Sequence, residues 1–323
     1  MKQPLLSICI ATYNRGSLIG ETLDTIVPQL TGQVEIVVVD GASTDNTEEV
    51  VRHYAHKESR IRYFRLPKKG GVDHDYDLAV QNARGEMCWL FTDDDLLKPG
   101  AVDEVMKRIA KGYDLIIVNA EMRNRDLTHT YEDRRMHLEA DREYAPSEFE
   151  RFFVDAFDYL SFIGGVVIRR TLWMERNRER YMGTEFIHVG VIFQKPFAGS
   201  LFILAEPHII IRYGNAQWVS RHFEIWMFRW PGMAWSFSGF SEGAMAKVSY
   251  REPWRKFRVL VYQRSVGNYS LGLYREYLAT KPSGKVWRLC ALLIARLPVS
   301  ICIGACNIYF FLHGVRLPYP KGE

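Results

Sequence analysis

Three consecutive acidic residues follow a short apolar segment of this chain. Asp93-Asp94-Asp95 follows Met87–Phe91, with Thr92 between them. Two carboxylates separated by one residue at a turn can point to the same side and offer the hard oxygen ligands that Mg²⁺ or Mn²⁺ prefers. A metal held there can neutralise a diphosphate leaving group. Asp95 could instead cap a helix that begins near Pro99, but two further polar clusters favour the metal interpretation.

These two clusters also come directly after apolar runs. Thr12-Tyr13-Asn14-Arg15 follows Ile8–Ala11, and the segment from Asp40 to Thr47 follows Val34–Val39. At the end of a buried strand, the Asp40 carboxylate can accept a hydrogen bond from a base N–H or a ribose hydroxyl. The alternative role for Asp40 is structural, as the first residue of an Asx-turn in Asp-Gly.

The elements that must position these clusters alternate between strand and helix over the first 120 residues. The expected strands are Leu6–Ala11, Val34–Val39, Ile61–Leu66, Met87–Phe91 and Leu115–Val118, and the expected helices are Leu18–Leu30, Thr44–Ala55, Asp73–Ala83 and Pro99–Ala110. Such alternation predicts an α/β fold with a mostly parallel sheet and helices on both faces. Ligands of these sheets bind beyond the carboxyl ends of the strands, so we expect the three clusters to converge there.

Beyond residue 120 the pattern changes. The charge-dense segment 123–151 is expected to be an excursion outside the core, followed by strand-like segments at Phe162–Arg169 and Leu201–Ile211 and a helix at Thr184–Lys195. From Trp218 onward the pattern is helical and rich in aromatic residues. We therefore divide the chain into a catalytic domain, residues 1–215, and a helical, basic region, residues 216–323.

Composition excludes several classes of protein. The 323 residues are 47% hydrophobic and 25% charged, with a net charge of +4, which is typical of a folded protein and too small for a nucleic-acid binder. From Arg251 to the end there are 12 basic and 3 acidic residues, which indicates an anionic partner for this region. The five cysteines form no C-x-x-C pair and the first residues do not resemble a signal peptide, so we expect reduced thiols in a cytosolic setting.

The most hydrophobic stretch is Leu289–Leu312, interrupted by Arg296 and Pro298. Its length could span a bilayer, which takes about 20 residues, but an arginine near the middle of a span is costly. Basic residues flank it on both sides. We expect this stretch to associate with the cytoplasmic face of the cell membrane by bent or shallow insertion; the alternative is a buried helix pair broken at Pro298.

Taken together, the motifs resemble the family 2 glycosyltransferases. The matching segments run from Ser7 to Arg15, from Glu35 to Thr47, from Lys69 to Asp73, from Ala83 to Glu86 and from Trp89 to Asp95, in the family's order and spacing. The segments Gly70–Asp73 and Cys88–Phe91 are most similar to the bacterial branch that adds deoxysugars to O-antigen, such as abequosyltransferases. The resemblance implies the GT-A fold, a nucleotide-sugar donor and inversion of the anomeric centre.

By position, the resemblance also assigns site residues. It places Thr12, Tyr13 and Arg15 in the pocket for the base of the nucleotide-sugar, and Asp40 on the base itself. It places Asp73 and Asp94 near the ribose or the sugar. Asp95 would bind the metal and the diphosphate, with Asp93 nearby. Two of these residues have alternative, structural roles: Asp73 could cap its own helix, and Arg15 could lie in a solvated turn.

The segment expected to carry the catalytic base departs from the family pattern. Many members carry an acidic pair before a later helix, whereas this chain has Gly183-Thr-Glu-Phe-Ile-His188. Glu185 and His188 are three residues apart and would share one face of a helix. Either can take a proton from a sugar hydroxyl. Glu185 could otherwise favour the positive end of its helix, and His188 could be a core residue.

The leading hypothesis is a glycosyltransferase that uses Mn²⁺ or Mg²⁺ to move a sugar from a nucleotide-sugar to a saccharide acceptor. A basic, apolar C-terminal region suits a lipid-linked acceptor of cell-surface polysaccharide or O-antigen synthesis. A sugar nucleotidyltransferase would need a glycine-rich phosphate loop, but Ile10–Gly16 holds one glycine. The non-enzymatic alternative is a membrane-bound saccharide-binding scaffold, which the intact aspartate triplet argues against.

Overall fold

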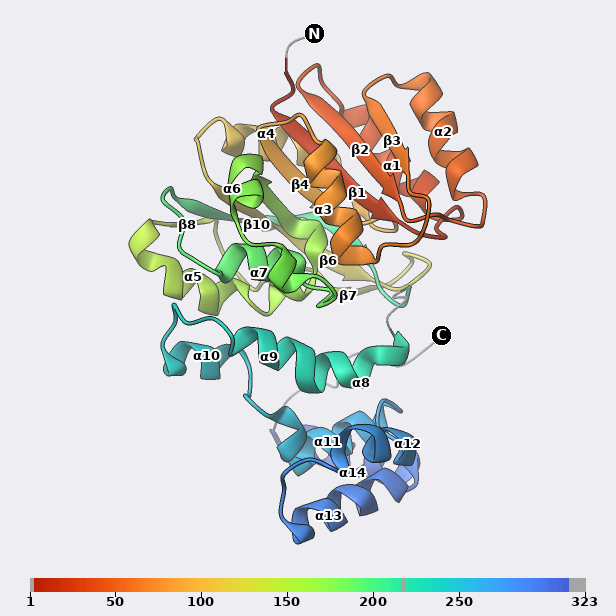
Figure 1. Ribbon diagram of the computed structural model, residues 1–323, viewed down its shortest axis with the longest axis vertical. Helices are drawn as coiled ribbons and strands as arrows, with labels where there is room; N and C mark the ends of the chain where they lie inside the picture. The colour runs from red at the N-terminus through yellow and green to blue at the C-terminus, as the bar shows by residue number, and fades with distance from the viewer. Residues whose placement is uncertain (1–2, 216–218, 314–323) are drawn as a thin grey trace. The chain divides into compact units, whose positions relative to one another are not determined.

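The computed structural model describes residues 3–215 and 219–313 (Figure 1). The chain forms two compact units. The first comprises residues 1–215 and 239–244, and the second comprises residues 216–238 and 245–323. The first unit holds the whole β-sheet, and the second is helical.

The sheet has ten strands. They are β1 (Leu6–Thr12), β2 (Val34–Asp40), β3 (Ile61–Arg65), β4 (Met87–Phe91), β5 (Leu96–Leu97), β6 (Leu115–Arg123), β7 (Thr130–Glu132), β8 (Arg142–Tyr144), β9 (Val166–Arg169) and β10 (Leu201–Arg212). The first four, together with β6, are the strands expected from the alternating pattern, and these predictions are confirmed. Their apolar residues are buried because helices cover the sheet.

The order across the sheet is β3-β2-β1-β4-β9-β6-β10-β5. Strand β1 pairs in parallel with β2 and β4, and β6 pairs in parallel with β10, while β9 runs antiparallel between β4 and β6. The larger strands other than β9 therefore point the same way, and the predicted mostly parallel sheet is confirmed. The carboxyl ends of β1, β2 and β4 lie side by side at one edge.

Helices of the first unit connect these strands. They are α1 (Ile19–Ile26), α2 (Thr47–Lys57), α3 (Val72–Asn82), α4 (Ala101–Ile109), α5 (Phe149–Ala156), α6 (Arg170–Glu175) and α7 (Ile187–Phe193). Helix α3 packs against β1 and β2, and α4 packs against β6. Gly71, with φ of +97°, stands at the cap position of α3, so Asp73 lies inside the helix and is not its cap.

The segment 123–151 differs from expectation. It contains β7, which pairs with β6, and β8, which pairs with β10. Tyr144 of β8 is fully buried, and its hydroxyl donates a 2.8 Å hydrogen bond to Asp155. The prediction that this segment lies outside the core is therefore wrong, because strands of three residues are too short to show an alternating pattern.

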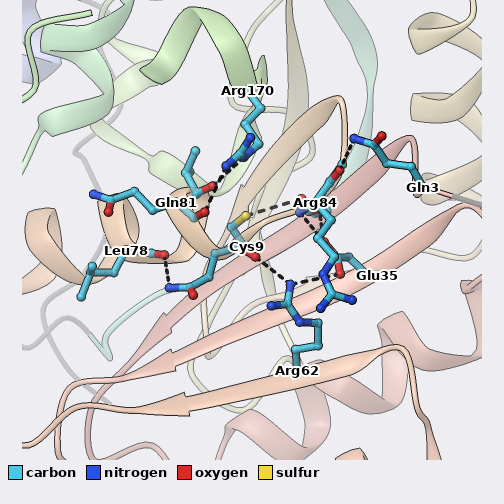
Figure 2. Close-up of polar contacts among 12 residues, drawn as sticks. Gln3, Cys9, Glu35, Arg62, Leu78, Gln81, Arg84 and Arg170 are labelled. Atoms are coloured by element: carbon cyan, nitrogen blue, oxygen red, sulfur yellow. Dashed lines mark hydrogen bonds and ion pairs between the residues drawn. The ribbon is translucent and has the colours of Figure 1, made fainter. Parts of the chain in front are cut away.

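At the starting ends of the strands, a buried polar network joins β1 to β2 (Figure 2). The Ser7 hydroxyl donates to the Glu35 carboxylate (2.7 Å), which also accepts the backbone N–H of Arg84 (2.7 Å) and faces the Arg62 guanidinium (3.5 Å). Because buried carboxylates are stable only when such partners satisfy them, we assign this network to the stability of the fold.

The second unit is built from helices. They include α8 (His222–Glu224), α9 (Trp230–Ala234), α11 (Phe257–Ser265), α12 (Leu271–Leu273), α13 (Lys285–Arg296) and α14 (Val299–His313); helix α10 (Glu242–Val248) begins in the first unit and ends in the second. An apolar core that includes Phe223, Trp254, Leu260 and Tyr269 holds this unit together. No single helix among the described residues is long and apolar enough to cross a membrane, and α13 and α14, which satisfy length and composition only as a pair, are bent by 106°.

Candidate active site

The first two polar clusters meet where β1 and β2 end. Thr12 stands opposite Asp40 in the parallel register, and the backbone N–H of Gly41 donates to the Thr12 carbonyl (2.9 Å). The backbone N–H of Arg15 donates to the Thr47 hydroxyl (2.9 Å). The loops that follow the two strands are thus fastened to each other, as we expected from the parallel strand ends.

Asp40 is fully buried beneath these loops. One of its oxygens accepts the backbone N–H of Ser43 (2.8 Å) and the other accepts the Tyr63 hydroxyl (2.5 Å). Burial, together with this hydrogen bond to a carboxylate, raises the pKa of Tyr63. The local turn role weighed for Asp40 is therefore present, and its contact with a base stays a prediction.

Tyr13 and Lys69 form a cation–π pair beside this loop junction. The Lys69 ammonium nitrogen lies 3.7 Å from the centre of the Tyr13 ring. Asp75, which we did not predict, is buried close by: a Cβ atom on Gly41 would come within 2.6 Å of its carboxylate. Burial raises the pKa of Asp75, and His74 and Lys69 oppose that rise. The alternation of Asp73, Asp75 and Asp77 along the sequence was a signal for this acidic helix start.

The aspartate triplet follows β4 and divides into two parts. Asp93 and Asp94 are half-buried and face the Arg15 guanidinium, at 3.5 Å each. Burial and the neighbouring Asp94 raise the pKa of Asp93 to about 7, and Arg15 opposes this rise. Burial also raises the pKa of Asp94. The first and third clusters therefore converge, and Arg15 is a residue of the site and not of a solvated turn.

Asp95, in contrast, points into the protein. Its carboxylate accepts the Thr92 hydroxyl (2.5 Å) on one oxygen and the backbone N–H of Arg212 (2.7 Å) on the other. Burial, and next the charge of Asp94, raise the pKa of Asp95 well above its ordinary value. Arg212 is a site residue that sequence reasoning missed, since nothing local links it to the triplet.

The donor set fits a divalent metal that is shared with a substrate. The described residues contain no group of three or more His, Cys, Asp or Glu side chains that could hold an ion by themselves. Mg²⁺ usually binds one or two carboxylates plus substrate phosphates and water, so a pair of carboxylates such as Asp93 and Asp94 would be enough on the side of the protein. Asp95, predicted as a ligand together with Asp93, is buried and accepts hydrogen bonds from Thr92 and Arg212, and its role as a ligand stays a prediction.

The predicted base pair Glu185 and His188 does not share a helix face. Helix α7 begins at Ile187, and Glu185 precedes it with φ of +73°. His188 is 1% exposed, and its Nε2 lies 2.8 Å from the Leu160 carbonyl. Burial lowers the pKa of His188 to about 4. The shared-face prediction is wrong because the helix starts later than expected, and His188 occupies a core position.

Asp73 contacts the turn that carries Glu185. Its carboxylate accepts the backbone N–H groups of Glu185 (2.7 Å) and Ile187 (3.0 Å), across more than a hundred residues of sequence. Burial raises the pKa of Asp73 to about 6, and the two backbone hydrogen bonds oppose that rise. Each carboxylate oxygen of Asp73 therefore accepts a backbone hydrogen bond from this turn, and the ribose or sugar contact that the resemblance implied stays a prediction.

The sequence matches a known family over more than half of the chain. Residues 7–176 match the family model described as glycosyl transferase family 2. The chain therefore belongs to the family 2 glycosyltransferases, and it is a glycosyltransferase.

Curated relatives give the same class. Abequosyltransferase RfbV of Salmonella typhimurium is 28% identical over 228 residues, which cover 65% of this chain and 67% of RfbV. A Campylobacter jejuni enzyme, GalNAc(5)-diNAcBac-PP-undecaprenol beta-1,3-glucosyltransferase, is 32% identical over 111 residues, which cover 34% of this chain and 36% of that enzyme. The chain thus spans about two thirds of the first relative and only about a third of the second.

Solved structures confirm the GT-A fold. S. aureus TarS 1-349 in complex with UDP superposes with a TM-score of 0.56 at 14% identity, over 98% of this chain and 95% of that one. Mannosyltransferase PcManGT from Pyrobaculum calidifontis, in complex with GDP-Man and Mn²⁺, gives 0.54 at 19% identity, over 96% and 88%. At these identities the likeness establishes the fold alone.

Proposed function

We propose that this glycosyltransferase moves a sugar from a nucleotide-sugar donor to a saccharide acceptor with the help of Mn²⁺ or Mg²⁺, and that it inverts the anomeric configuration. The observation that carries the proposal is the convergence of Arg15 with Asp93 and Asp94 where β1 and β4 end. Carboxylates and a guanidinium at one strand edge suit a diphosphate held through a metal.

On this proposal, the base of the donor lies between the Tyr13 ring and the loop after β2, with Asp40 below it. Asp93 and Asp94 would hold the metal, which when bound neutralises charge on the departing diphosphate. Arg15 lies next to both carboxylates, and its guanidinium would contact a phosphate oxygen of the donor. The relatives' UDP and GDP-Man complexes support a nucleotide donor.

Glu185 is the proposed base. It lies in the turn before α7, it is half-buried, and it is held by Asp73 at the start of α3. A carboxylate there would take the proton from the acceptor hydroxyl as that oxygen attacks the anomeric carbon. A single displacement of the diphosphate inverts the configuration.

The acceptor is proposed to be lipid-linked, at the cytoplasmic face of the cell membrane. A relative's name specifies an undecaprenol-linked acceptor, and that of RfbV specifies abequosyl transfer. In the second unit, α13 and α14 carry most of the large apolar side chains that are exposed, including Val286 (76%) and Phe311 (85%). At 1.5 Å per residue the 15 residues of α14 extend about 22 Å, short of the roughly 30 Å hydrocarbon core.

These features favour shallow insertion over a span. Helix α14 is apolar on all sides, yet only Cys302 and Cys306 are buried, so most of its surface lacks protein contacts. Lys285 and Arg288 at the start of α13 can meet anionic headgroups, at about 1 kcal/mol each. The basic residues Arg316 and Lys321, also counted in the sequence, lie outside the described residues.

A donor panel tests the catalytic proposal. The purified chain would be offered UDP-, GDP-, CDP- and dTDP-sugars, with and without Mn²⁺, and release of the nucleoside diphosphate would be measured. We expect one donor class to be hydrolysed or transferred, with activity lost in EDTA and restored by Mn²⁺. Equal activity in EDTA would refute metal dependence, and release of pyrophosphate from a nucleoside triphosphate and a sugar phosphate would favour a nucleotidyltransferase.

A further inference from the structure

The first turns of α3 connect three parts of the site. Asp75 lies against Gly41, at the end of β2. The Tyr76 hydroxyl donates a 3.0 Å hydrogen bond to the Phe91 carbonyl, the last residue of β4 before the aspartate triplet. Asp73 accepts two backbone N–H groups from the turn before α7. One short stretch of helix thus contacts the nucleotide side, the metal side and the acceptor side.

The turn held by Asp73 needs support from outside. Gly183 and Glu185 both have φ in the left-handed region, at +77° and +73°, which a residue with a side chain such as glutamate rarely adopts. Helix α7 has no side-chain cap of its own at Phe186. Asp73 supplies the missing acceptor from α3, so it satisfies N–H groups that a helix start leaves open. Thr184 holds the turn locally, through its contacts with Tyr181 and Phe186, and Asp73 adds the connection to α3.

We propose that Asp73 is a positioning residue: it clasps the turn 183–187 to α3 and thereby sets where Glu185 stands relative to Asp93 and Asp94. This inference rests on the proposed role of Glu185 as the base. It replaces the donor contact that the sequence suggested for Asp73. The expected consequence is that Asp73 affects the chemical step more than donor binding.

Amide hydrogen exchange tests the clasp independently of any substrate. In Asp73→Asn, one acceptor oxygen is lost, and peptides covering 182–189 should exchange at least tenfold faster than in the wild-type chain, while peptides of β1 and β2 should not change. Asp77→Asn is the matched control, because Asp77 is a buried carboxylate on the same helix that instead accepts the Trp173 indole N–H (2.8 Å) and faces Arg178. Unchanged exchange at 182–189 would overturn the clasp.

Kinetics with the donor found in the panel test the positioning role. For Asp73→Asn we expect kcat to fall at least tenfold, with the KM for the donor within threefold of wild type. The control Asp77→Asn should not show this fall in kcat at nearly constant KM. A raised KM with kcat unchanged would overturn the inference and return Asp73 to donor binding. If Asp73→Asn does not fold, Asp73→Ser, which keeps a small acceptor, takes its place. If no donor is turned over by the wild type, the proposed function fails, and the exchange result still decides the clasp.

Discussion

The backbone N–H of Arg212 donates a 2.7 Å hydrogen bond to the carboxylate of Asp95. The Arg212 guanidinium also donates to the Asp94 carbonyl (3.1 Å). The end of β10 is therefore fastened to the loop after β4, although the two are far apart in sequence. This contact turns Asp95 inward and leaves the carboxylates of Asp93 and Asp94 facing Arg15.

The first prediction separates the members of the triplet. Asp93→Asn and Asp94→Asn should abolish Mn²⁺-dependent binding of the donor, with melting temperatures close to wild type, because these side chains are half-buried and their ion pairs with Arg15 are long, at 3.5 Å each. Asp95→Ala should also abolish transfer, but with a loss of about 1–3 kcal/mol in unfolding free energy for each buried donor left unpaired. Calorimetric titration and denaturant unfolding measure the two effects. A stable Asp95→Ala that has lost only metal affinity would restore Asp95 as the ligand.

The second prediction concerns the base pocket. Asp40→Ala should weaken binding of the nucleoside diphosphate at least tenfold while leaving the dependence on Mn²⁺ in place. Tyr63→Phe, which removes the hydroxyl that donates to Asp40 (2.5 Å), should have a smaller effect of the same kind. Tyr54→Phe is the control, since its hydroxyl donates to Asp24 (2.7 Å) away from the site. Unchanged affinity in Asp40→Ala would assign Asp40 to the local turn alone.

The third prediction distinguishes Glu185 from His188. Glu185→Gln should keep donor binding and lose about 10²–10⁴ in turnover, as is typical when a general base is removed. His188→Leu should leave turnover per folded molecule and its pH profile unchanged, because His188 is buried and its pKa is about 4. It should lower the unfolding free energy by about 1–3 kcal/mol, because the Leu160 carbonyl loses its partner. Near-normal turnover in Glu185→Gln would place the base elsewhere.

The fourth prediction is a pH dependence with opposite signs for stability and turnover. The pKa of Asp73 in the folded chain is about 6, above its ordinary value of 3.8, so the folded state binds its proton more tightly than the unfolded state does. Asp73 should therefore lower stability above pH 6, and this cost, up to about 3 kcal/mol, should disappear as the pH falls from 6 towards 4. Turnover should fall over the same range, because a protonated Asp73 holds the Glu185 turn less tightly.

Comparison of the wild type with Asp73→Asn isolates this group from the other buried carboxylates. Denaturant unfolding at pH 4.5, 6 and 7.5 should show a difference in unfolding free energy between the two chains, and this difference should change with pH. The charge of Glu185 contributes to the raised pKa of Asp73. In a Glu185→Gln background, the pH midpoint of the Asp73 titration should therefore be lower. A difference that is constant with pH would contradict the assignment of this titration to Asp73.

The fifth prediction concerns the membrane. Removing everything after Thr280 would also delete Ala291, Ile294 and Ala295, which belong to the core of the second unit, so substitutions are the sharper test. Leu289→Gln with Leu293→Gln on α13, both more than half exposed, should reduce sedimentation with phosphatidylglycerol vesicles at least tenfold.

In the same assay, Tyr250→Gln is the control, because Tyr250 is 47% exposed in the second unit but lies outside α13 and α14. Wild-type binding should be weaker to phosphatidylcholine vesicles, which lack the negative charge that Lys285 and Arg288 would meet. Undiminished binding of the Leu289 and Leu293 variant would show that these helices do not contact the bilayer.

Much of the strand framework could be predicted from local pattern. Val34–Val39 is a continuous β-branched run and Met87–Phe91 is wholly apolar, which is typical of strands buried on both faces, and both form strands. Since parallel strands end at one edge, the meeting of Thr12, Asp40 and Asp93 followed from the fold class alone. The start of α7 could not be predicted, because Gly183 and Glu185 adopt left-handed conformations that a distant carboxylate supports.

The sequence by itself therefore determined the class of fold, the family and the edge of the sheet that carries the polar residues, because each depends on short-range periodicity and on motif spacing. The tertiary structure decided which carboxylates face the site. Asp95 is turned inward by Arg212, Asp73 is committed to the turn that bears Glu185, and His188 is enclosed beside Leu160. Each of these outcomes depends on a hydrogen bond between residues distant in the chain, and such a partner leaves no periodic trace in the sequence around either residue.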